Sequence, residues 1–254
     1  MIKKPWVEPN WPAAPNVRAI STIRQGGVSQ PPWESLNLGD HVNDDPRHVA
    51  QNRRRLQHLA GLPHEPQWLT QVHGCAVLDA AELYESHSCE ADAVYSNTAN
   101  SLCAVLTADC LPVLFVDPDG REVAAAHAGW RGLAGGVLEQ TVERFATAPQ
   151  TLLAWLGPAI GAASFEVGAD VREVFLEWSG ECESAFVEHG EGHWLADIYQ
   201  LARLRLRKAG ITAIYGGNYC TYSDAECFYS YRRDGETGRM ATMIWFNEMQ
   251  QFKL

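Results

Sequence analysis

The feature that most constrains the fold is a pair of continuous apolar runs in the middle of the chain, at residues 102–106 and 113–116. Neither run alternates apolar with polar residues, and both have the length of an ordinary strand. Such runs are typical of strands that are covered on both faces. They predict a sheet buried between two other layers, which a chain of 254 residues is long enough to supply.

Several other segments indicate further strands around these two. Apolar and β-branched residues bounded by Gly, Pro or charged residues predict strands at 17–23, 68–72, 122–126, 152–156, 211–215 and 241–246. The segments at 68–72 and 122–126 are expected to deliver His73 and His127 to the loops that follow them. A glycine-rich loop is expected at 129–136.

Helix start and stop signals lie between the expected strands. Asp45 can cap a helix that begins at Pro46 and ends at Gly61, and Asp170 and Asp197 can start two more. A further helix is expected after the glycine-rich loop. Because strands and helices mix without strict alternation, we expect an α+β fold with a mixed sheet flanked by helices. No linker or repeat divides the chain, so residues 1–254 are expected to form one layered domain.

The composition excludes several classes of partner. A net charge of −11 opposes binding to nucleic-acid backbones and anionic membranes. Prolines follow the basic start of the chain, so no signal core is apparent, and no run reaches membrane-spanning length. Seven scattered cysteines are an odd number and do not suggest a disulfide framework. We therefore expect a cytoplasmic protein, in which Cys220 and Cys227 are more simply buried thiols than a bonded or metal-binding pair.

Three residues are candidate metal ligands: His73, Cys110 and His127. Each lies near a Gly or Pro where a strand is expected to give way to a loop, and side chains there are rigidly held yet reach solvent. Two imidazoles and a thiolate suit zinc, and three protein ligands leave a fourth position free. Their spacing matches no short zinc motif, so a buried core thiol and a hydrogen-bonded loop histidine stay open as readings.

Two arginines beside glycine-rich turns are candidate anion-binding residues. Arg24 and Arg131 are the best placed cations in an acidic chain, with Arg232 and Arg233 as further candidates. A glycine-rich run that feeds a helix exposes backbone N–H groups and can hold an anion. Residues 129–136 match neither established phosphate-loop pattern, however. Close packing of the glycines therefore stays open as the alternative.

Longer motifs around these residues carry a resemblance to a known family. The motifs lie at residues 22–29, 36–39, 71–74, 107–112, 126–132, 156–161 and 230–235. In that order they closely resemble the polyphenol oxidase/laccase-domain family, also called the peptidoglycan-editing-factor family, whose members act as purine nucleoside phosphorylases. The resemblance extends from about Arg18 to Phe246.

The resemblance implies phosphorolysis of purine nucleosides such as adenosine, inosine and methylthioadenosine. In that reaction phosphate attacks the ribose C1′ and the purine departs, and Arg24 and Arg131 would hold the phosphate. The family is also associated with adenosine deamination, for which zinc is suited because it lowers the pKa of bound water to about 7. Asp109 is a candidate acid/base group, or alternatively a turn-capping residue.

Three other functions remain open at this stage. Cys110 and His127 can form the nucleophile and base of a metal-free hydrolase, although that leaves His73 without a role. The family's older name implies a copper-dependent polyphenol oxidase, and imidazole and thiolate also bind copper. Multicopper oxidases use closely spaced histidine pairs, and the nine histidines include no His-x-His. A non-catalytic binding module is the last alternative, and the oligomeric state is not specified by these patterns.

Overall fold

A six-stranded mixed sheet lies at the centre of the computed structural model, which describes residues 4–83 and 89–248. Residues 1–3, most of the basic start of the chain, lie outside the described residues. The strand order is β12-β8-β6-β7-β4-β3. The two outermost pairings are parallel and the three inner ones antiparallel. The strands are β3 (Val77–Asp79), β4 (Ala93–Ser96), β6 (Leu111–Val116), β7 (Val123–Ala128), β8 (Leu153–Leu156) and β12 (Ala213–Gly216).

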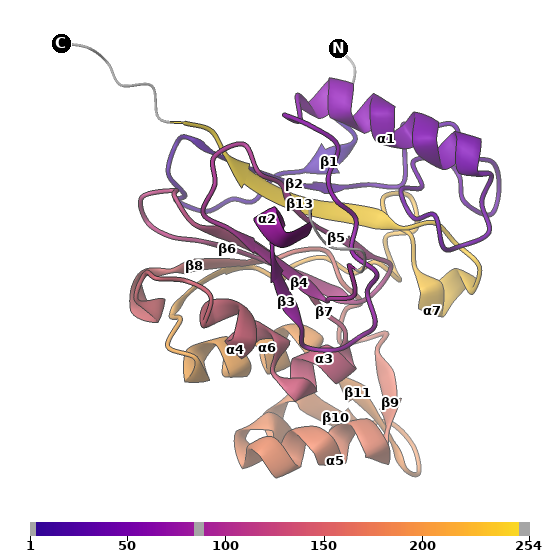
Figure 1. The fold of residues 1–254 in the computed structure, drawn as a ribbon. Helices are drawn as coiled ribbons and strands as arrows, with labels where there is room; N and C mark the ends of the chain where they lie inside the picture. Colours follow the sequence, from indigo (N-terminus) through magenta and orange to yellow (C-terminus); the bar gives the residue numbers. More distant parts are fainter. Residues whose placement is uncertain (1–3, 84–88, 249–254) are drawn as a thin grey trace.

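A second, antiparallel sheet of four strands packs against one face of the central sheet. Its order is β1-β2-β13-β5, so the last strand of the chain pairs with one of the first. Figure 1 shows the two sheets stacked, with the long helix α1 outside the smaller one. The strands are β1 (Trp6–Val7), β2 (Val17–Thr22), β5 (Cys103–Thr107) and β13 (Met240–Phe246), and α1 is Pro46–Ala60.

The two apolar runs lie in the middle layers, as their composition predicts. In β6, Val113 and Phe115 belong to the core beneath the helices, whereas Leu114 packs into the core between the sheets. In β5, Val105 points into the core between the sheets and Leu106 into the core beneath α1. Each strand therefore buries both faces, which confirms the prediction.

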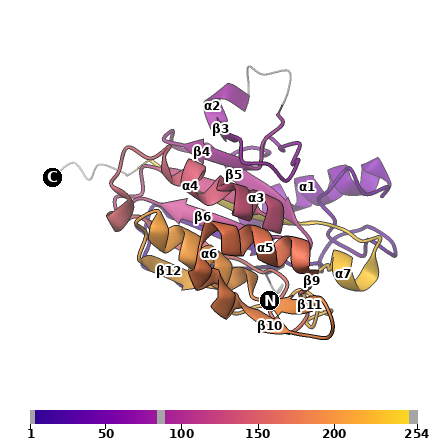
Figure 2. The ribbon, with the colours of Figure 1, turned by 90° about the horizontal axis from the view of Figure 1, so that it is seen from below.

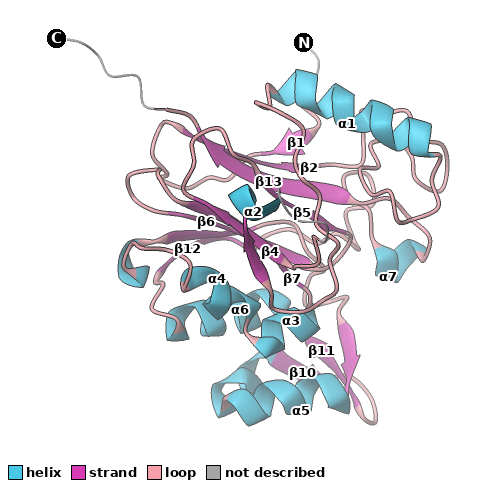
Figure 3. Ribbon diagram, in the orientation of Figure 1, coloured by secondary structure: helices cyan, strands magenta, loops and turns pink. Residues whose placement is uncertain are grey.

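Helices cover the other face of the central sheet. α3 (Trp130–Gly135), α4 (Val137–Val142) and α6 (Ile198–Lys208) lie on that face, and α5 (Ala169–Trp178) lies beyond them (Figure 2). A small antiparallel sheet, β10-β11-β9, accompanies α5. Figure 3 shows the resulting mixed α+β composition, which confirms the expected fold class. The remaining elements are α2 (Ala80–Leu83), α7 (Tyr231–Asp234), β9 (Glu166–Gly168), β10 (Phe186–Glu188), β11 (His193–Ala196) and two short 3-10 helices, Pro149–Thr151 and Gly180–Ala185.

The observed ends of the helices can be compared with those predicted from capping residues. The Asp45 carboxylate accepts the Arg47 N–H at 2.8 Å, and Gly61 ends the helix with φ 63°, so both predicted ends of α1 are confirmed. Asp197 caps α6 in the same way. Asp170 does not cap α5, because the helix already begins at Ala169 and Asp170 lies within its first turn. None of the helices in the described residues is long and apolar enough to cross a membrane.

Two predicted elements are wrong. Residues 68–72 form no strand, since only Thr70 makes an isolated bridge, to Glu90. The expected glycine-rich loop is largely the helix α3, which ends at Gly136 with φ 100°. A Cβ on Gly132 would lie 2.7 Å from the Gly74 carbonyl oxygen. This glycine is therefore needed for close packing, which is the alternative left open for the run.

Candidate metal centre

The fold brings the three candidate ligands together at one end of the central sheet. The ligand atoms of His73, Cys110 and His127 all lie within 4.8 Å of one another, and Cys110 Sγ lies 4.0 Å from His73 Nε2. Cys110 directly precedes β6 and His127 lies within β7, and these strands pair in register. His127 is therefore inside its strand rather than in the loop after it. His73 lies in a turn with φ 60°.

A buried carboxylate that the sequence patterns did not reveal holds this arrangement. Asp92 is fully buried, and its oxygens accept the backbone N–H groups of Val72, His73 and Gly74 at 3.2, 2.9 and 2.6 Å. The same carboxylate lies 2.8 Å from His127 Nδ1. With its proton on Nδ1, His127 presents the lone pair of Nε2 to the cluster, which is how carboxylates orient ligating histidines.

The electrostatics of the cluster favour a thiolate. Burial alone would raise the pKa of Cys110, but the charge of His127 and hydrogen bonds from both histidines lower it well below that of a free thiol. Burial likewise opposes charge on His127, yet Cys110 and Asp92 raise its pKa. Thiolate is the form of cysteine that binds metals. Without a metal, Cys110 and Asp92 thus stabilise a protonated His127, and a divalent cation bound to the thiolate would take the place of the His127 Nε2 proton.

The donor set and its spacing fit zinc. Zinc bonds of about 2.3 Å to sulfur and 2.0–2.1 Å to nitrogen place neighbouring tetrahedral ligands roughly 3.6 Å apart. The observed 4.0 Å between Cys110 Sγ and His73 Nε2 is close to that separation. His127 is buried while His73 is exposed, so the fourth side of the cluster faces solvent. These three residues can hold a single metal ion with an open position.

The open side faces a cavity of about 540 Å³, which is large enough for a nucleoside-sized ligand. Tyr231 lies at this cavity with 61% of its surface exposed. The lining residues are Asp40, His41, Leu69, Thr70, Gln71, His73, Leu106, Thr107, Ala108, Cys110, His127, Tyr231 and Arg239. A cavity of similar size, about 580 Å³, lies beside Trp6 and Trp245, but no histidine or cysteine lines it.

Asp109 has a structural position beside the cluster. Its carboxylate accepts hydrogen bonds from Thr221 Oγ1 at 2.6 Å, Ser230 Oγ at 3.0 Å and the Arg232 N–H at 2.7 Å. It is buried and does not line the cavity. All three partners lie 112 to 123 positions away in the chain, so these contacts attach the turn at Asp109 to distant loops and do not cap it locally.

The two predicted anion-binding arginines lie away from the cavity lining. The Arg24 guanidinium donates to the carbonyl oxygens of Glu34 and Ala225, both at 3.1 Å. The Arg131 guanidinium lies over the Trp130 ring, 4.3 Å from its centroid. Neither is among the described residues that line the cavity. The lining cation is Arg239, whose pKa burial lowers, and beside it burial and the Arg239 charge lower the pKa of His41.

Fold and cluster together define an α+β protein with a candidate single-ion metal centre at a cavity. Residues 18–247 match the model of the family described as multi-copper polyphenol oxidoreductase laccase, and the chain belongs to this family. This confirms the resemblance seen in the sequence.

The relatives of the chain carry a second description. The protein is 56% identical over 240 residues to a protein of Escherichia coli K12 named purine nucleoside phosphorylase YfiH, with 94% of this chain and 98% of that protein covered. It is 52% identical to the Pseudomonas aeruginosa protein named purine nucleoside phosphorylase PA4543, with 96% of this chain and 99% of that protein covered. Among solved structures, Neisseria meningitidis NMB0706 has a TM-score of 0.92 at 49% identity, with 96% and 100% covered. YlmD from Geobacillus stearothermophilus has a TM-score of 0.90 at 32% identity, with 98% of each chain covered.

Proposed function

We propose that the protein is a zinc-dependent purine nucleoside phosphorylase acting on adenosine and inosine, with methylthioadenosine as a further candidate substrate. The observation that carries this proposal is the cluster of two imidazoles and a thiolate facing a cavity of about 540 Å³. The names of relatives that are 50–56% identical over nearly the whole chain support the choice of reaction.

The reaction places two demands on the cavity. Phosphate must be held close to the ribose C1′, and charge on the departing purine must be stabilised as the glycosidic bond breaks. Zinc held by His73, Cys110 and His127 would supply a Lewis acid in the cavity wall. Tyr231 offers an exposed ring at the same cavity, on which a purine can stack.

Several side chains hold the cluster ready for a substrate. Asp92 fixes the His127 ring and the backbone turn at His73 through four contacts. Gln71 makes two hydrogen bonds to the backbone of Leu106. Its Nε2 donates to the Leu106 carbonyl oxygen at 2.8 Å, and its Oε1 accepts the Leu106 N–H at 2.7 Å. The turn that carries His73 is therefore attached to β5 although it forms no strand. Such preorganisation reduces the entropy lost when a substrate is oriented.

Adenosine deamination is a second proposed activity of the same centre. The open side of the cluster provides a place where zinc would activate water for attack on the purine carbon that bears the amino group. Production of inosine from adenosine in phosphate-free buffer, lost on removal of the metal, would support it.

Two competing functions use the same residues. The Cys110 and His127 charges suit a metal-free hydrolase, which requires that a thiol alkylator inactivate the enzyme without releasing metal. The family description suits a copper-dependent oxidase, which requires oxygen uptake with phenols. We place the protein in the cytoplasm because its seven cysteines, an odd number scattered along the chain, do not suggest a disulfide framework.

One experiment separates these functions. Adenosine or inosine is incubated with the protein with and without phosphate, in air and under argon, and the metal content of the protein is measured. Phosphorolysis yields free base and ribose 1-phosphate only when phosphate is present. Free ribose formed at the same rate without phosphate, or a metal-free protein insensitive to chelators, would contradict the proposal.

A further inference from the structure

We propose that Arg239 forms an oxyanion subsite in the cavity that the metal ligands also line, and that its Nε and Nη2 groups bind inorganic phosphate. The identity of the anion rests on the proposed function, whereas the subsite itself rests on the geometry of Arg239. The proposal concerns a residue outside the two arginines that the sequence patterns favour.

Arg239 is held firmly at the edge of the cavity. Its backbone N–H donates to Asn37 Oδ1 at 2.9 Å, and its carbonyl accepts the Leu38 N–H at 3.2 Å. A Cβ on Gly39 would lie 2.8 Å from Arg239 Cγ, so the aliphatic stem packs directly on that glycine. Arg239 is therefore attached to the loop at residues 37–39 both by its backbone and by its aliphatic stem.

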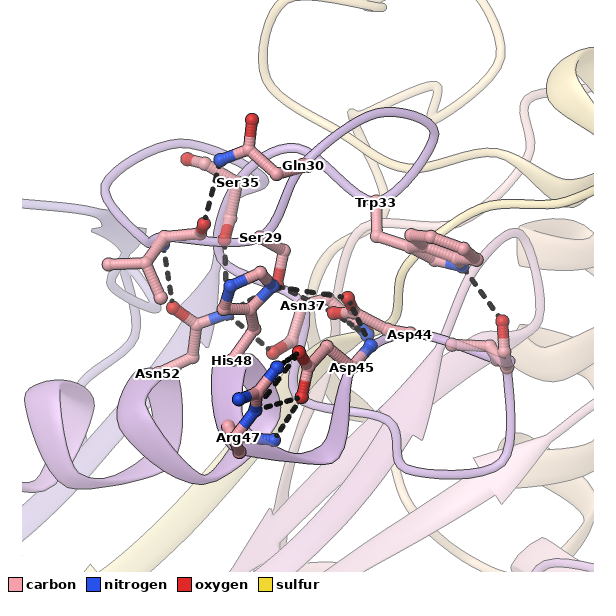
Figure 4. Close-up of polar contacts among 12 residues, drawn as sticks. Ser29, Gln30, Trp33, Ser35, Asn37, Asp44, Asp45, Arg47, His48 and Asn52 are labelled. Carbon is pink, nitrogen blue, oxygen red and sulfur yellow. Dashed lines mark hydrogen bonds and ion pairs between the residues drawn. The ribbon is translucent and has the colours of Figure 1, made fainter.

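The loop that carries Asn37 is itself anchored to α1. The Asn37 amide donates to Asp44 Oδ2 at 2.9 Å, and Asn52 of α1 donates to the Asn37 carbonyl at 2.9 Å. Figure 4 shows these residues converging above the start of α1. The position of Arg239 is therefore set before any ligand arrives, which lowers the entropy cost of binding.

One edge of the guanidinium remains available for a ligand. Arg239 Nη1 donates to the carbonyl oxygens of Thr237 and Gly238 at 3.0 and 3.1 Å. Within residues 4–83 and 89–248, its Nε and Nη2 make no hydrogen bond and no carboxylate pairs with it. That edge of arginine matches two oxygens of a phosphate group. The cavity thus contains a preoriented fork without a protein acceptor.

The charges around the cavity support an anion at this place. Asp40 is the one acidic residue in the described lining, and its carboxylate lies 3.3 Å from Arg53 Nη2. Arg239 is therefore not neutralised by that acid. The acidic groups that act on the Arg239 charge are Cys110, Asp109 and Tyr231, whose ring centroid lies 5.9 Å from the guanidinium, and none of them forms an ion pair with it in the described part of the chain. In a chain of net charge −11, such a cation inside a cavity is a local exception to the overall field. In Arg24, by contrast, Nε and Nη1 both donate to carbonyl oxygens and Nη2 lies 3.6 Å from the Glu34 carboxylate, so no edge of the guanidinium is left over.

The test measures binding of inorganic phosphate to the metal-loaded protein by isothermal titration calorimetry, for Arg239→Gln, Arg239→Lys, Arg131→Gln and a control, Arg55→Gln. Arg55 is exposed on α1, so the control removes the same charge outside the cavity. Hydrogen bonds to a charged group contribute about 1.5–3 kcal/mol. At about 1.4 kcal/mol per tenfold change, this predicts a phosphate Kd roughly 10- to 150-fold weaker in Arg239→Gln.

Arg239→Lys is expected to fall between the wild type and Arg239→Gln, because lysine keeps the charge but not the fork. The control is expected to keep wild-type affinity, and metal content should be unchanged in all variants. In steady-state assays, the KM for phosphate should rise in Arg239→Gln while the KM for inosine changes less than threefold. If Arg239→Gln fails to fold, the lysine variant decides.

Three results would overturn the inference. The first is a phosphate Kd in Arg239→Gln equal to the wild-type value, or the same result in a folded Arg239→Lys if the glutamine variant does not fold. The second is a loss of phosphate affinity confined to Arg131→Gln. The third is a loss of phosphate affinity produced only by stripping the metal. Failure of the proposed function looks different. A wild-type protein that binds phosphate through Arg239 but cleaves no nucleoside retains the subsite and refutes the phosphorylase. Phosphorolysis with an unchanged phosphate KM in Arg239→Gln refutes the subsite alone.

Discussion

Replacing Asp92 by asparagine tests how the candidate metal centre is held. The substitution keeps the size of the side chain but removes its charge and one of its two acceptor oxygens. In the native protein, Oδ2 accepts the Val72 and Gly74 N–H groups at 3.2 and 2.6 Å. Oδ1 accepts the His73 N–H at 2.9 Å and lies 2.8 Å from His127 Nδ1. All four partners are donors when His127 carries its proton on Nδ1.

Neither orientation of the asparagine amide satisfies this set. If the amide NH₂ faces His127, the ring must accept at Nδ1, so its proton moves to Nε2 and the lone pair for the metal is lost. If the NH₂ faces Val72 and Gly74 instead, two backbone donors meet a donor and the turn at His73 must move. Each buried donor left without an acceptor costs about 1–3 kcal/mol. Two such donors predict a loss of roughly 2–6 kcal/mol in the free energy of unfolding.

The metal affinity should fall as well. Removing the carboxylate that orients a ligating histidine typically weakens metal binding about 10- to 100-fold. Zinc affinity is measured by competition with a chromophoric chelator, and stability of the apoprotein by denaturant unfolding. Asp119→Asn, in an exposed turn, is the matched control for loss of one negative charge. Zinc affinity within threefold of wild type, together with an unfolding free energy within about 0.5 kcal/mol, would refute the reasoning.

Three further outcomes are expected. Cys110→Ser should remove most of the bound zinc and leave the circular dichroism spectrum unchanged, because the side chain is a ligand more than a core residue; full zinc content would contradict this. Tyr231→Ala should raise the KM for inosine about 5- to 150-fold through loss of base stacking, by analogy with the ~1–3 kcal/mol per base of nucleic-acid stacking, and an unchanged KM for inosine would contradict this. Burial alone would raise the pKa of Glu122, but hydrogen bonds from Thr147 and Tyr95 lower it, so its stabilising effect is present above about pH 4.5 and is lost as the pH falls further. The difference in unfolding free energy between wild type and Glu122→Gln should therefore be constant above about pH 5 and shrink below about pH 4.5, whereas a difference independent of pH would exclude this role.

The elements that the sequence predicted correctly are those whose cause is local. A strand that is buried on both faces consists of consecutive apolar residues, as at 102–106 and 113–116. A capping residue likewise lies next to the helix end that it caps. The failed strand at 68–72 has a non-local cause. Its last backbone donor, the Val72 N–H, is taken by the Asp92 carboxylate 20 positions away, and the Thr70 N–H donates to the Cys89 carbonyl oxygen. No local sequence pattern predicts either partner.

The site shows the same division. His73, Cys110 and His127 stood out because few other residue types bind soft metals, and the fold brings them together. Arg239 did not stand out, because what positions it is Asn37, 202 positions earlier in the chain. Arg24 appeared available because the sequence does not show that its guanidinium donates to the carbonyl of Ala225, 201 positions away. Chemical type is visible in a sequence, whereas the availability of a side chain depends on distant partners.

The cavity lies where the chain passes from one sheet to the other. β5 of the smaller sheet ends at Thr107 and β6 of the central sheet begins at Leu111, so Asp109 lies in the crossing, with φ 91°. Hydrogen bonds from distant loops fix this turn, and the next residue is Cys110. Since Met240 pairs with Thr107, Arg239 reaches the same end from the smaller sheet. The candidate metal ligands Cys110 and His127 thus belong to the central sheet, and the proposed phosphate-binding residue Arg239 belongs to the smaller sheet. The core between the two sheets sets the distance between these side chains.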